Sequence, residues 1–331
     1  MPDIFGLSIA EVLPRVGALD QVARVDSLVD TDGLARGMRR LRVITGGGLE
    51  FDVLPDRGLD IGQAWFQGMP LAWVSAVGSA GPAFYEPEGR GFLRTFGGGL
   101  LATCGLDSFG PPVSDEDGTV GMHGRVGQIP ARLTRAEAGR EGIRIEGTVR
   151  QAAVFAENLV LRRQISTEFG ANSVVIDDTV TNEGAESSAH MVLYHFNLGW
   201  PLLDEGAEFE VPGATATPRD ADAQAGLGHE LDFDAPQPGF REQVFLYRST
   251  RGIAHLTNRA RGLRFTLRFS ESLPALFEWK MTAPQHYVLG IEPANTHVIL
   301  GRRAARAAGQ LPRLAPGASS SYRLSVEVER I

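Results

Sequence analysis

The stretch YHFNLGWPLL, residues 194–203, places a histidine and an asparagine two residues apart among aromatic and aliphatic side chains. Side chains of a β-strand alternate between its two faces. A strand here therefore puts His195 and Asn197 on one face and Tyr194 and Phe196 on the other. Such a polar pair in an apolar strand is either a hydrogen-bonded pair in the core or the floor of a binding site, and these residues alone leave both interpretations open.

A second candidate group is the carboxylate of Glu292, which ends the apolar segment YVLGIEPAN at 287–295. Pro293 cannot continue a strand ladder, so Glu292 is expected at a strand end, either exposed to solvent or placed as a base. A histidine, with an ordinary pKa of about 6.5, and a carboxylate form an acid–base pair that works near neutral pH. This chemistry suits proton transfer on a small polyol and, with more ligands, a metal site.

A third candidate is His123, which lies in the glycine-rich stretch MHGRVGQIPA at 122–131, two residues before Arg125. Glycines beside a histidine let the backbone approach a ligand closely. A histidine in an ordinary turn is an equally good interpretation.

Common catalytic and cofactor motifs are absent. The sequence has no phosphate-binding P-loop, no HExxH motif, no pair of cysteines for zinc and no GxSxG motif. Its glycine triplets at 46–48 and 97–99 lack dinucleotide-binding spacing and are interpreted as turns. Cys104 lies in an apolar run, which predicts a buried and inert thiol.

The overall composition is that of an ordinary soluble globular protein, with 331 residues, 43% hydrophobic and 22% charged. A net charge of −8 argues against a nucleic-acid partner. One cysteine excludes an intramolecular disulfide and fits a reducing compartment. Because no secretion signal and no membrane-spanning apolar run are seen, we expect a cytoplasmic protein that does not contact membranes.

Alternation of apolar and polar residues recurs along the chain and indicates half-buried strands of antiparallel sheets. Many short strands separated by Gly, Pro and Asp turns are typical of an all-β sandwich or barrel. The clearest alternating segments are 142–149, 159–169, 173–182, 263–269 and 322–330.

Helices are expected to be few and short, at 8–16, broken near its proline, and at 302–310. Two long loops, 76–92 and 216–243, are expected to be functional, because long loops in compact domains often are. No repeat or linker marks a boundary, so we interpret residues 1–331 as a single domain.

Three motifs in a fixed order resemble the aldose 1-epimerase (galactose mutarotase) superfamily: MHGR at 122–125, YHFN at 194–197 and IEPAN at 291–295. The nearest match is to its bacterial branch called domain of unknown function DUF4432. The resemblance implies a large twisted antiparallel β-sandwich, the supersandwich. Further resembling segments are VLPDRGLDIG at 53–62, GFLRTFGGGLLATCGLDSFG at 91–110 and FEWKM at 277–281.

The resemblance also implies roles for the candidate residues. In mutarotases a late glutamate takes the proton of the anomeric hydroxyl and a histidine gives one to the ring oxygen, so the sugar ring opens and closes on the other face. Carried over, Glu292 is the base and His195 the acid, while His123 holds the sugar. Asn197 orients His195 or bonds a sugar hydroxyl. The reaction needs no metal and no organic cofactor.

Five more residues are predicted to bind substrate. Trp279 is expected to stack on a sugar face, whereas Lys280 alternates to the other side of a regular strand, so at most one of them points inward. Arg57 and Arg94 are candidates for sugar hydroxyls or an acidic substituent, with a salt bridge at a strand edge as the alternative. Arg125 is displaced relative to the HGFAR element of the phosphohexose branch, because the chain reads HGRVG there.

Two other functions remain open at this point. One is a carbohydrate-binding protein without turnover. The other is a metal-assisted sugar isomerase or lyase on the same scaffold, with His123, His195 and Glu292 as ligands. All three predict a small sugar as the partner and a monomer or homodimer, and none names the sugar.

Overall fold

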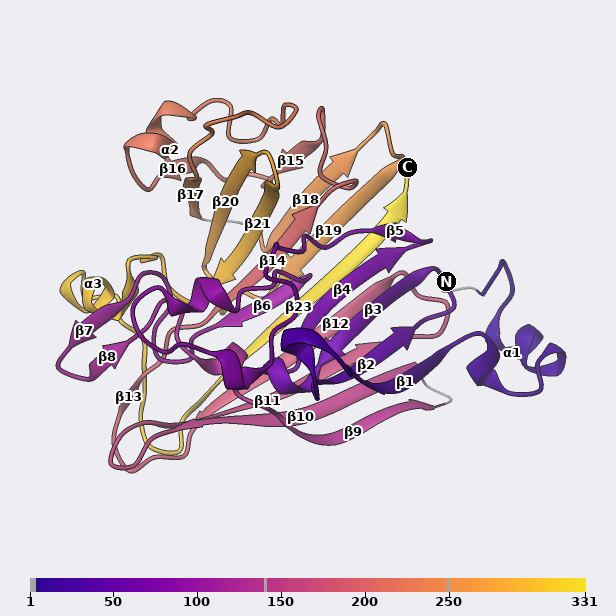
Figure 1. Ribbon diagram of the computed structural model, residues 1–331, viewed down its shortest axis with the longest axis horizontal. Coiled ribbons are helices and arrows are strands. Elements are labelled where there is room, and N and C mark those ends of the chain that lie inside the picture. Colours follow the sequence, from indigo (N-terminus) through magenta and orange to yellow (C-terminus); the bar gives the residue numbers. More distant parts are fainter. Residues whose placement is uncertain (1–3, 140–141, 249–250) are drawn as a thin grey trace.

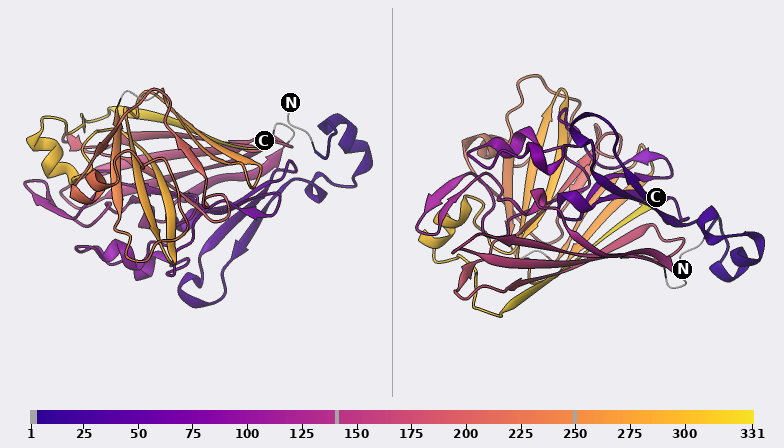
Figure 2. Two further views of the ribbon diagram at one scale, coloured as in Figure 1. Left: turned by 90° about the horizontal axis from the view of Figure 1, so that it is seen from above. Right: turned by 60° about the horizontal axis from the view of Figure 1, so that its bottom comes forward.

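The computed structural model describes residues 4–139, 142–248 and 251–331. Two large antiparallel sheets form most of it and lie against each other as a twisted sandwich (Figures 1 and 2). The first sheet runs in the order β1-β2-β3-β4-β6-β14-β21-β20-β17-β16, with β5 paired to β4, and the second runs β15-β18-β19-β23-β12-β11-β10-β9. The fold expected from the alternating segments is therefore confirmed.

The elements have the following bounds. The first sheet contains β1 (Arg24–Val29), β2 (Arg39–Ile44), β3 (Leu49–Leu54), β4 (Asp60–Phe66), β5 (Met69–Pro70), β6 (Leu101–Cys104), β14 (Leu193–Gly199), β16 (Ala216–Pro218), β17 (Gln243–Arg248), β20 (Ala275–Ala283) and β21 (His286–Ala294). The second contains β9 (Arg132–Gly139), β10 (Gly142–Ala152), β11 (Asn158–Thr167), β12 (Ser173–Asn182), β15 (Glu208–Glu210), β18 (Ile253–Asn258), β19 (Leu263–Phe269) and β23 (Ser319–Arg330). Two small ribbons pair β7 (Val113–Asp115) with β8 (Gly118–Val120) and β13 (Ser188–Ala189) with β22 (Arg313–Leu314).

Helices are short, as expected. They are α1 (Ile9–Val12), α2 (Ala221–Ala225) and α3 (Gly301–Ala307), together with single 3₁₀ turns at Leu13–Arg15, Leu19–Gln21, Gly33–Ala35, Pro55–Arg57, Pro82–Phe84, Gly91–Arg94 and Val126–Gln128. The predicted helix at 8–16 is α1 followed by the first of these turns, and the one at 302–310 is α3. None of the described helices has the length and apolar character needed to cross a membrane.

The core between the sheets is built by the period-two pattern of the second sheet. Its register aligns Ile145 with Ile165, Ile165 with Ile176, and Ile176 with Leu324 across four adjacent strands. All four side chains are buried, and they form a continuous apolar row facing the first sheet. Because alternate residues share a face, the polar residues between them face outward.

One charged group lies inside this core. The guanidinium of Arg163 on β11 bonds Asp60 at 2.9 Å and Asp178 at 2.7 Å, and its side chain is fully buried. The hydroxyl of Tyr194 on β14 donates to the same Asp178 at 2.8 Å. Tyr194 therefore points between the sheets, which turns the next residue, His195, to the outer face of the first sheet.

Candidate active site

Strand β14 carries the central residue of the site. His195 lies opposite Ala102 of β6, and Asn197 lies opposite Gly290 of β21. The Nε2 atom of His195 is 3.1 Å from Oε1 of Glu292 on β21. The predicted acid–base pair is thus brought into direct contact by two neighbouring strands, and both side chains are almost entirely buried.

The absence of a side chain at Gly290 makes this contact possible. A Cβ atom there would stand 2.8 Å from Oε1 of Glu292, 2.9 Å from Cβ of Trp279 and 3.2 Å from Cε1 of His195. Real Cβ contacts are longer than the first two distances, so glycine leaves the space in which the three side chains converge. The glycine two residues before Glu292 is therefore a sequence signal of the site, and it was not among the predicted site residues.

His123 is held beside the pair by its backbone. It has φ near +60°, its N–H donates to the carbonyl of Gly110 and its own carbonyl accepts from Gly105, both at 2.9 Å. A Cβ on Gly124 would come within 2.3 Å of the carbonyl oxygen of Gly105. The flanking glycine thus serves the packing of two loops, which in turn fixes the histidine ring.

Aromatic rings surround the two histidines. The ring centroids of Trp279 and Phe96 lie 5.3 and 5.4 Å from that of His195. The ring of Phe92 lies 5.0 Å from His123, which itself is 5.9 Å from His195. Trp73 completes the group, with centroids 6.0 Å from both Trp279 and Phe96. We call Trp73, Phe92, Phe96 and Trp279 the aromatic cup.

Burial in the cup changes the charges of the catalytic candidates. It lowers the pKa of His195 to about 3, helped by His123 and opposed by the side chain of Asn197. It lowers the pKa of His123 to about 4 and raises the pKa of Glu292 to about 8. At neutral pH both imidazoles are therefore neutral and Glu292 is protonated, so the His195–Glu292 pair holds one proton.

The side chain of Asn197 is hydrogen-bonded to the backbone of His195. Its Nδ2 donates to the carbonyl of His195 at 3.0 Å and to that of Gly99 at 2.9 Å. Its Oδ1 and the Nδ1 of His195 are buried without a hydrogen-bond partner among the described residues. Unpartnered buried polar atoms are rare in folded proteins, and their presence here is consistent with a site that takes a polar ligand.

A charged pair closes one side of the cup. The Nε1–H of Trp279 donates to Oε2 of Glu242 at 3.1 Å, and Arg219 bonds Oε1 of the same carboxylate at 3.1 Å. Both charged residues come from the loop at 216–243. That loop was predicted to be functional, but neither residue was, because no local pattern tells which loop residue reaches a distant strand.

The predicted arginines are engaged elsewhere. Arg94 is largely exposed and pairs with Glu86 at 3.2 Å. Arg125 pairs with Glu157 at 2.7 Å. Arg57 donates to three backbone carbonyls, those of Gly127, Ala80 and Thr95. The structure therefore does not bring Arg94 and Arg125 into contact with the acid–base pair, and Arg57 ties together loops around the site.

Lys280 points away from the cup, as strand alternation requires once Trp279 faces it. Its Nζ donates to the carbonyls of His229, Glu230 and Asp232 and lies over the ring of Phe233. Of the two residues at 279 and 280, only the tryptophan lies at the site.

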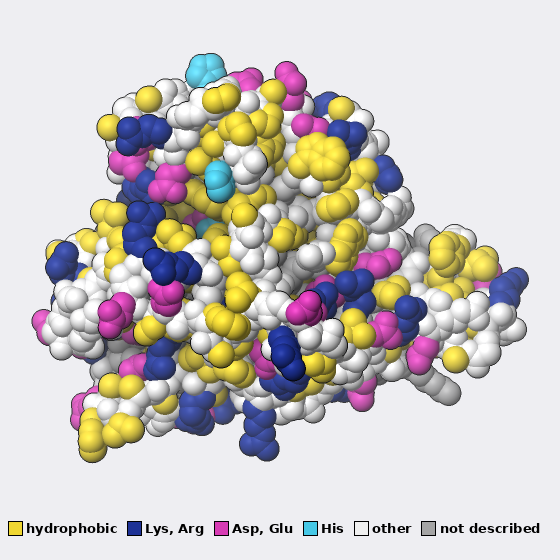
Figure 3. Space-filling model, viewed as in Figure 1, with side chains coloured by type: hydrophobic (Ala, Val, Ile, Leu, Met, Phe, Trp, Pro, Cys, Tyr) yellow, Lys and Arg dark blue, Asp and Glu magenta, His cyan; other side chains and the backbone are white. Residues whose placement is uncertain are grey.

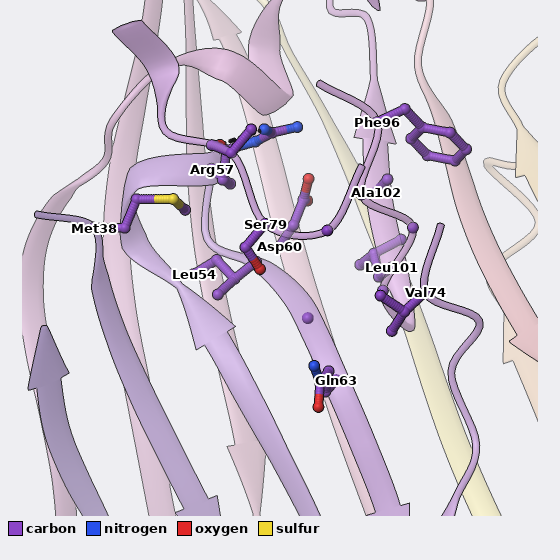
Figure 4. A pocket seen from close by; sticks show the side chains of 16 residues that line it. Met38, Leu54, Arg57, Asp60, Gln63, Val74, Ser79, Phe96, Leu101 and Ala102 are labelled. Carbon is purple, nitrogen blue, oxygen red and sulfur yellow. Dashed lines mark hydrogen bonds between the residues drawn. The ribbon is translucent and has the colours of Figure 1, made fainter. Parts of the chain in front are cut away.

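A hollow adjoins the aromatic cup at Phe96. The face shown in Figure 3 has a depression beside histidine side chains, with hydrophobic and charged side chains around it. The hollow is small, with about 50 Å³ open to a water-sized sphere, which is well below the roughly 300–1,000 Å³ of ordinary small-molecule sites. Phe96 and Ala102 border both the hollow and the acid–base pair. Figure 4 shows Arg57, Asp60 and Ser79 on the opposite wall of the hollow from Phe96.

Within the described ranges, no group of three or more His, Cys, Asp or Glu side chains is arranged to hold a metal ion. Cys104 is fully buried, and burial raises the pKa of its thiol. Asp107 bonds Arg302 at 2.9 Å and accepts from Gln151 at 2.7 Å. Its carboxylate thus belongs to a buried hydrogen-bonded network.

Comparison with known proteins gives a family and a fold. The sequence profile of the family described as domain of unknown function DUF4432 matches residues 35–328. No curated protein matches the chain. A crystal structure of a putative aldose 1-epimerase from Klebsiella pneumoniae is 28% identical, with a TM-score of 0.86 over 92% of this chain and 83% of that one.

Two more distant structures share the fold. A galactose mutarotase-like protein from Clostridium acetobutylicum is 12% identical, with a TM-score of 0.66 over 93% of this chain and 98% of that one. The galactose 1-epimerase from Lactobacillus acidophilus is 14% identical, with a TM-score of 0.60 over 92% and 98%. The architecture is therefore that of mutarotase-like proteins.

Proposed function

The chain belongs to the DUF4432 family, and from this premise we propose that it is a sugar mutarotase of the aldose 1-epimerase type. The observation that carries the proposal is the 3.1 Å contact between His195 and Glu292 inside the aromatic cup. A carboxylate and an imidazole that share one proton are suited to move protons on a small polyol without a further reagent. We also propose that residues 1–331 act as one domain.

The reaction proceeds by ring opening. The carboxylate of Glu292 removes the proton of the anomeric hydroxyl, while the Nε2–H of His195 gives a proton to the ring oxygen. The bond between C1 and the ring oxygen breaks and the C1 carbonyl forms. After rotation about the C1–C2 bond, the two transfers run in reverse on the other face of C1, so the pair returns to its starting state.

Ring opening leaves Glu292 protonated and His195 neutral. Burial favours these same forms, since it raises the pKa of Glu292 to about 8 and lowers that of His195 to about 3. The open-chain stage is thus electrostatically compatible with the site. Before ring opening, the proton that the pair holds must therefore move from Glu292 to Nε2 of His195 along their 3.1 Å contact, which gives the carboxylate and the imidazolium that the reaction uses.

The remaining site residues bind and orient. The indole of Trp279 offers an apolar face for the C–H bonds of a sugar ring. His123, neutral because burial lowers its pKa to about 4, bonds a sugar oxygen. Asn197 orients His195 through its carbonyl.

The test is anomer exchange measured by NMR on a panel of aldoses, deoxysugars, uronates and sugar phosphates. We expect the protein to accelerate exchange of at least one sugar, and His195→Ala and Glu292→Ala each to lower the enzyme-dependent rate by about 10²–10⁴-fold. His229→Ala is the matched control, since that side chain is 83% exposed. A sugar that binds without faster exchange would instead identify a carbohydrate-binding protein, and catalytic variants as fast as wild type would refute the assigned roles.

A further inference from the structure

The two ends of the 216–243 loop are fixed side by side. Strand β16 at its start pairs with β17, which follows it, and the N–H of Arg219 donates to the carbonyl of Val244 at 2.9 Å. This pairing brings the guanidinium of Arg219 to 3.1 Å from Oε1 of Glu242. The same guanidinium also pairs with the neighbouring carboxylate of Asp220 at 2.7 Å. The Arg219–Glu242 contact is therefore set by the sheet and does not depend on the path of the loop between these residues.

The second carboxylate oxygen of Glu242 holds the aromatic cup. Oε2 accepts the Nε1–H of Trp279 at 3.1 Å, and an indole has no other polar atom by which to be oriented. The Trp279 ring stands edge-on to His195, with centroids 5.3 Å apart and planes at 73°. The carboxylate of Glu242 thus contacts the acid–base pair only indirectly, by fixing the Trp279 ring that lies against His195.

The same two residues act on the pair by charge. The negative charge of Glu242 raises the pKa of Glu292, after burial the largest effect, and the positive charge of Arg219 opposes it. Glu242 also raises the pKa of His123 against the effect of burial. The two members of the Arg219–Glu242 ion pair therefore have opposite effects on the pKa of Glu292, which holds the proton used in the proposed reaction.

Resting on the mutarotase function proposed above, we propose that Glu242 and Arg219 are a charged clamp that fixes the Trp279 ring over the His195–Glu292 pair and balances the charge that Glu292 feels. Neither residue exchanges a proton with the sugar in this role. Both are positioning residues, and their effect is to set the pH range in which the pair keeps its one proton.

We expect substitutions of Glu242 and Arg219 to shift the pH dependence of the exchange rate in opposite directions. The pair loses its proton as the pH rises through the pKa of Glu292, near 8, so the enzyme-dependent exchange rate falls there. Glu242→Gln keeps an acceptor for Trp279 but removes the negative charge, which moves the pH at which the rate falls to a lower value. Arg219→Gln removes the positive charge and moves it to a higher value. Each shift is expected to be about half a pH unit, as for one solvent-screened charge.

A third variant separates position from charge. Glu242→Ala removes both the charge and the acceptor for Trp279, so KM is expected to rise about fivefold beyond the value of Glu242→Gln, the equivalent of one hydrogen bond of about 1 kcal/mol. Thermal unfolding of each variant checks that the fold is intact. Equal KM values for the two Glu242 variants would refute the positioning role.

The charge role can be measured without any sugar. In protein labelled with ¹³C at glutamate carboxyls, the Glu292 signal is assigned by its loss in Glu292→Gln and then titrated in wild type, Glu242→Gln and Arg219→Gln. Midpoints that move down and up, respectively, support the clamp even if no sugar is turned over, which separates its fate from that of the proposed reaction. Midpoints that stay fixed or move together overturn it.

Discussion

Strand β14 separates two buried polar groups that differ in how completely their atoms are hydrogen-bonded. On its inner face Tyr194 donates to Asp178, which also accepts two bonds from Arg163. On its outer face, Nδ1 of His195 and Oδ1 of Asn197 have no partner among the described residues. Because buried polar atoms are nearly always bonded, the inner group is complete as a structural unit, whereas the outer group keeps hydrogen-bonding capacity that the described residues leave unused.

The two groups also differ in how they keep charge inside the protein. Burial lowers the pKa of Arg163, but Asp178 and Asp60 outweigh it and raise the pKa overall, so the guanidinium stays charged. Burial raises the pKa of Asp60, and the charge of Arg163 opposes that shift. At the outer group burial raises the pKa of Glu292 to about 8, and a proton neutralises the carboxylate. One group is stabilised by fixed charges and the other holds a mobile proton, which is the property that acid–base catalysis needs.

The largest effect is expected from breaking the inner group. Arg163→Met leaves Asp60 and Asp178 buried without their cation, and removing one partner of a buried ion pair costs about 3–5 kcal/mol. The matched control is Arg162→Met on the same strand, where the arginine is 52% exposed and pairs with Glu183, so a loss below about 1 kcal/mol is expected. Unfolding in urea measures both. Equal losses would show that the inner group does not carry the stability assigned to it.

Replacing Glu292 in the outer group is expected to have an intermediate effect on stability, and that effect depends on pH. A carboxyl whose folded pKa of about 8 lies above the ordinary value of 4.5 binds its proton more tightly in the folded state. Its contribution to stability is complete below pH 4.5 and is lost as the pH rises to about 8. The pKa of His195 is instead lowered on folding, to about 3, so its effect on stability is confined to pH values below its ordinary pKa of 6.5. Between pH 6.5 and 8 the titration of His195 therefore does not offset that of Glu292.

The measurement is the free energy of unfolding at pH 6.5 and 8 for wild type and Glu292→Gln. Relative to the variant, wild type is expected to lose roughly 2 kcal/mol over this interval. Glu271→Gln, at an exposed turn between β19 and β20, is the control and should keep the wild-type slope. A Glu292→Gln slope equal to that of wild type would mean that this carboxyl is not protonated in the folded protein.

Sequence patterns could predict the strands and the pairing of His195 with Asn197, because alternation is a local property that each strand carries in its own residues. Alternation sets the face on which Ile145 and Ile165 lie, whereas their pairing is fixed by the assembled sheet. The family resemblance added Glu292 to the site, since its own segment predicts only a carboxylate at a strand end. That end was placed wrongly, because β21 continues through Pro293 to Ala294. The parts of the structure that could be predicted depend on residues that are close in sequence or on a known motif order.

The aromatic cup could not be predicted in the same way. Trp73, Phe96 and Trp279 come from separate segments, and only the assembled sheet and its loops bring their rings together. Glu242 and Arg219 lie in a loop that was expected to be functional, yet the residues that matter are those that the pairing of β16 with β17 sets against the site. Such contacts arise from tertiary structure and leave no periodic signal.

Lys280 shows why a charged residue beside a site need not belong to it. It is the only lysine in the 331 residues, and its ammonium donates to the carbonyls of His229, Glu230 and Asp232. An ammonium directs three donors at three converging acceptors, whereas the planar guanidinium of an arginine has a different geometry. Lys280 thus ties the middle of the 216–243 loop to β20, on the opposite face from Trp279.

This tie predicts the smallest and most local effect. In Lys280→Met the amides of residues 229–232 are expected to exchange with solvent about tenfold faster, because hydrogen bonds from a charged donor contribute about 1.5 kcal/mol. Lys280→Arg, which keeps the charge but not the three-donor geometry, should lie close to Lys280→Met. Amides of β11 and β12 serve as the internal reference and should be unchanged. Full protection in Lys280→Arg would show that charge alone holds the loop, and uniform acceleration across the protein would show that Lys280, like Arg163, stabilises the whole fold.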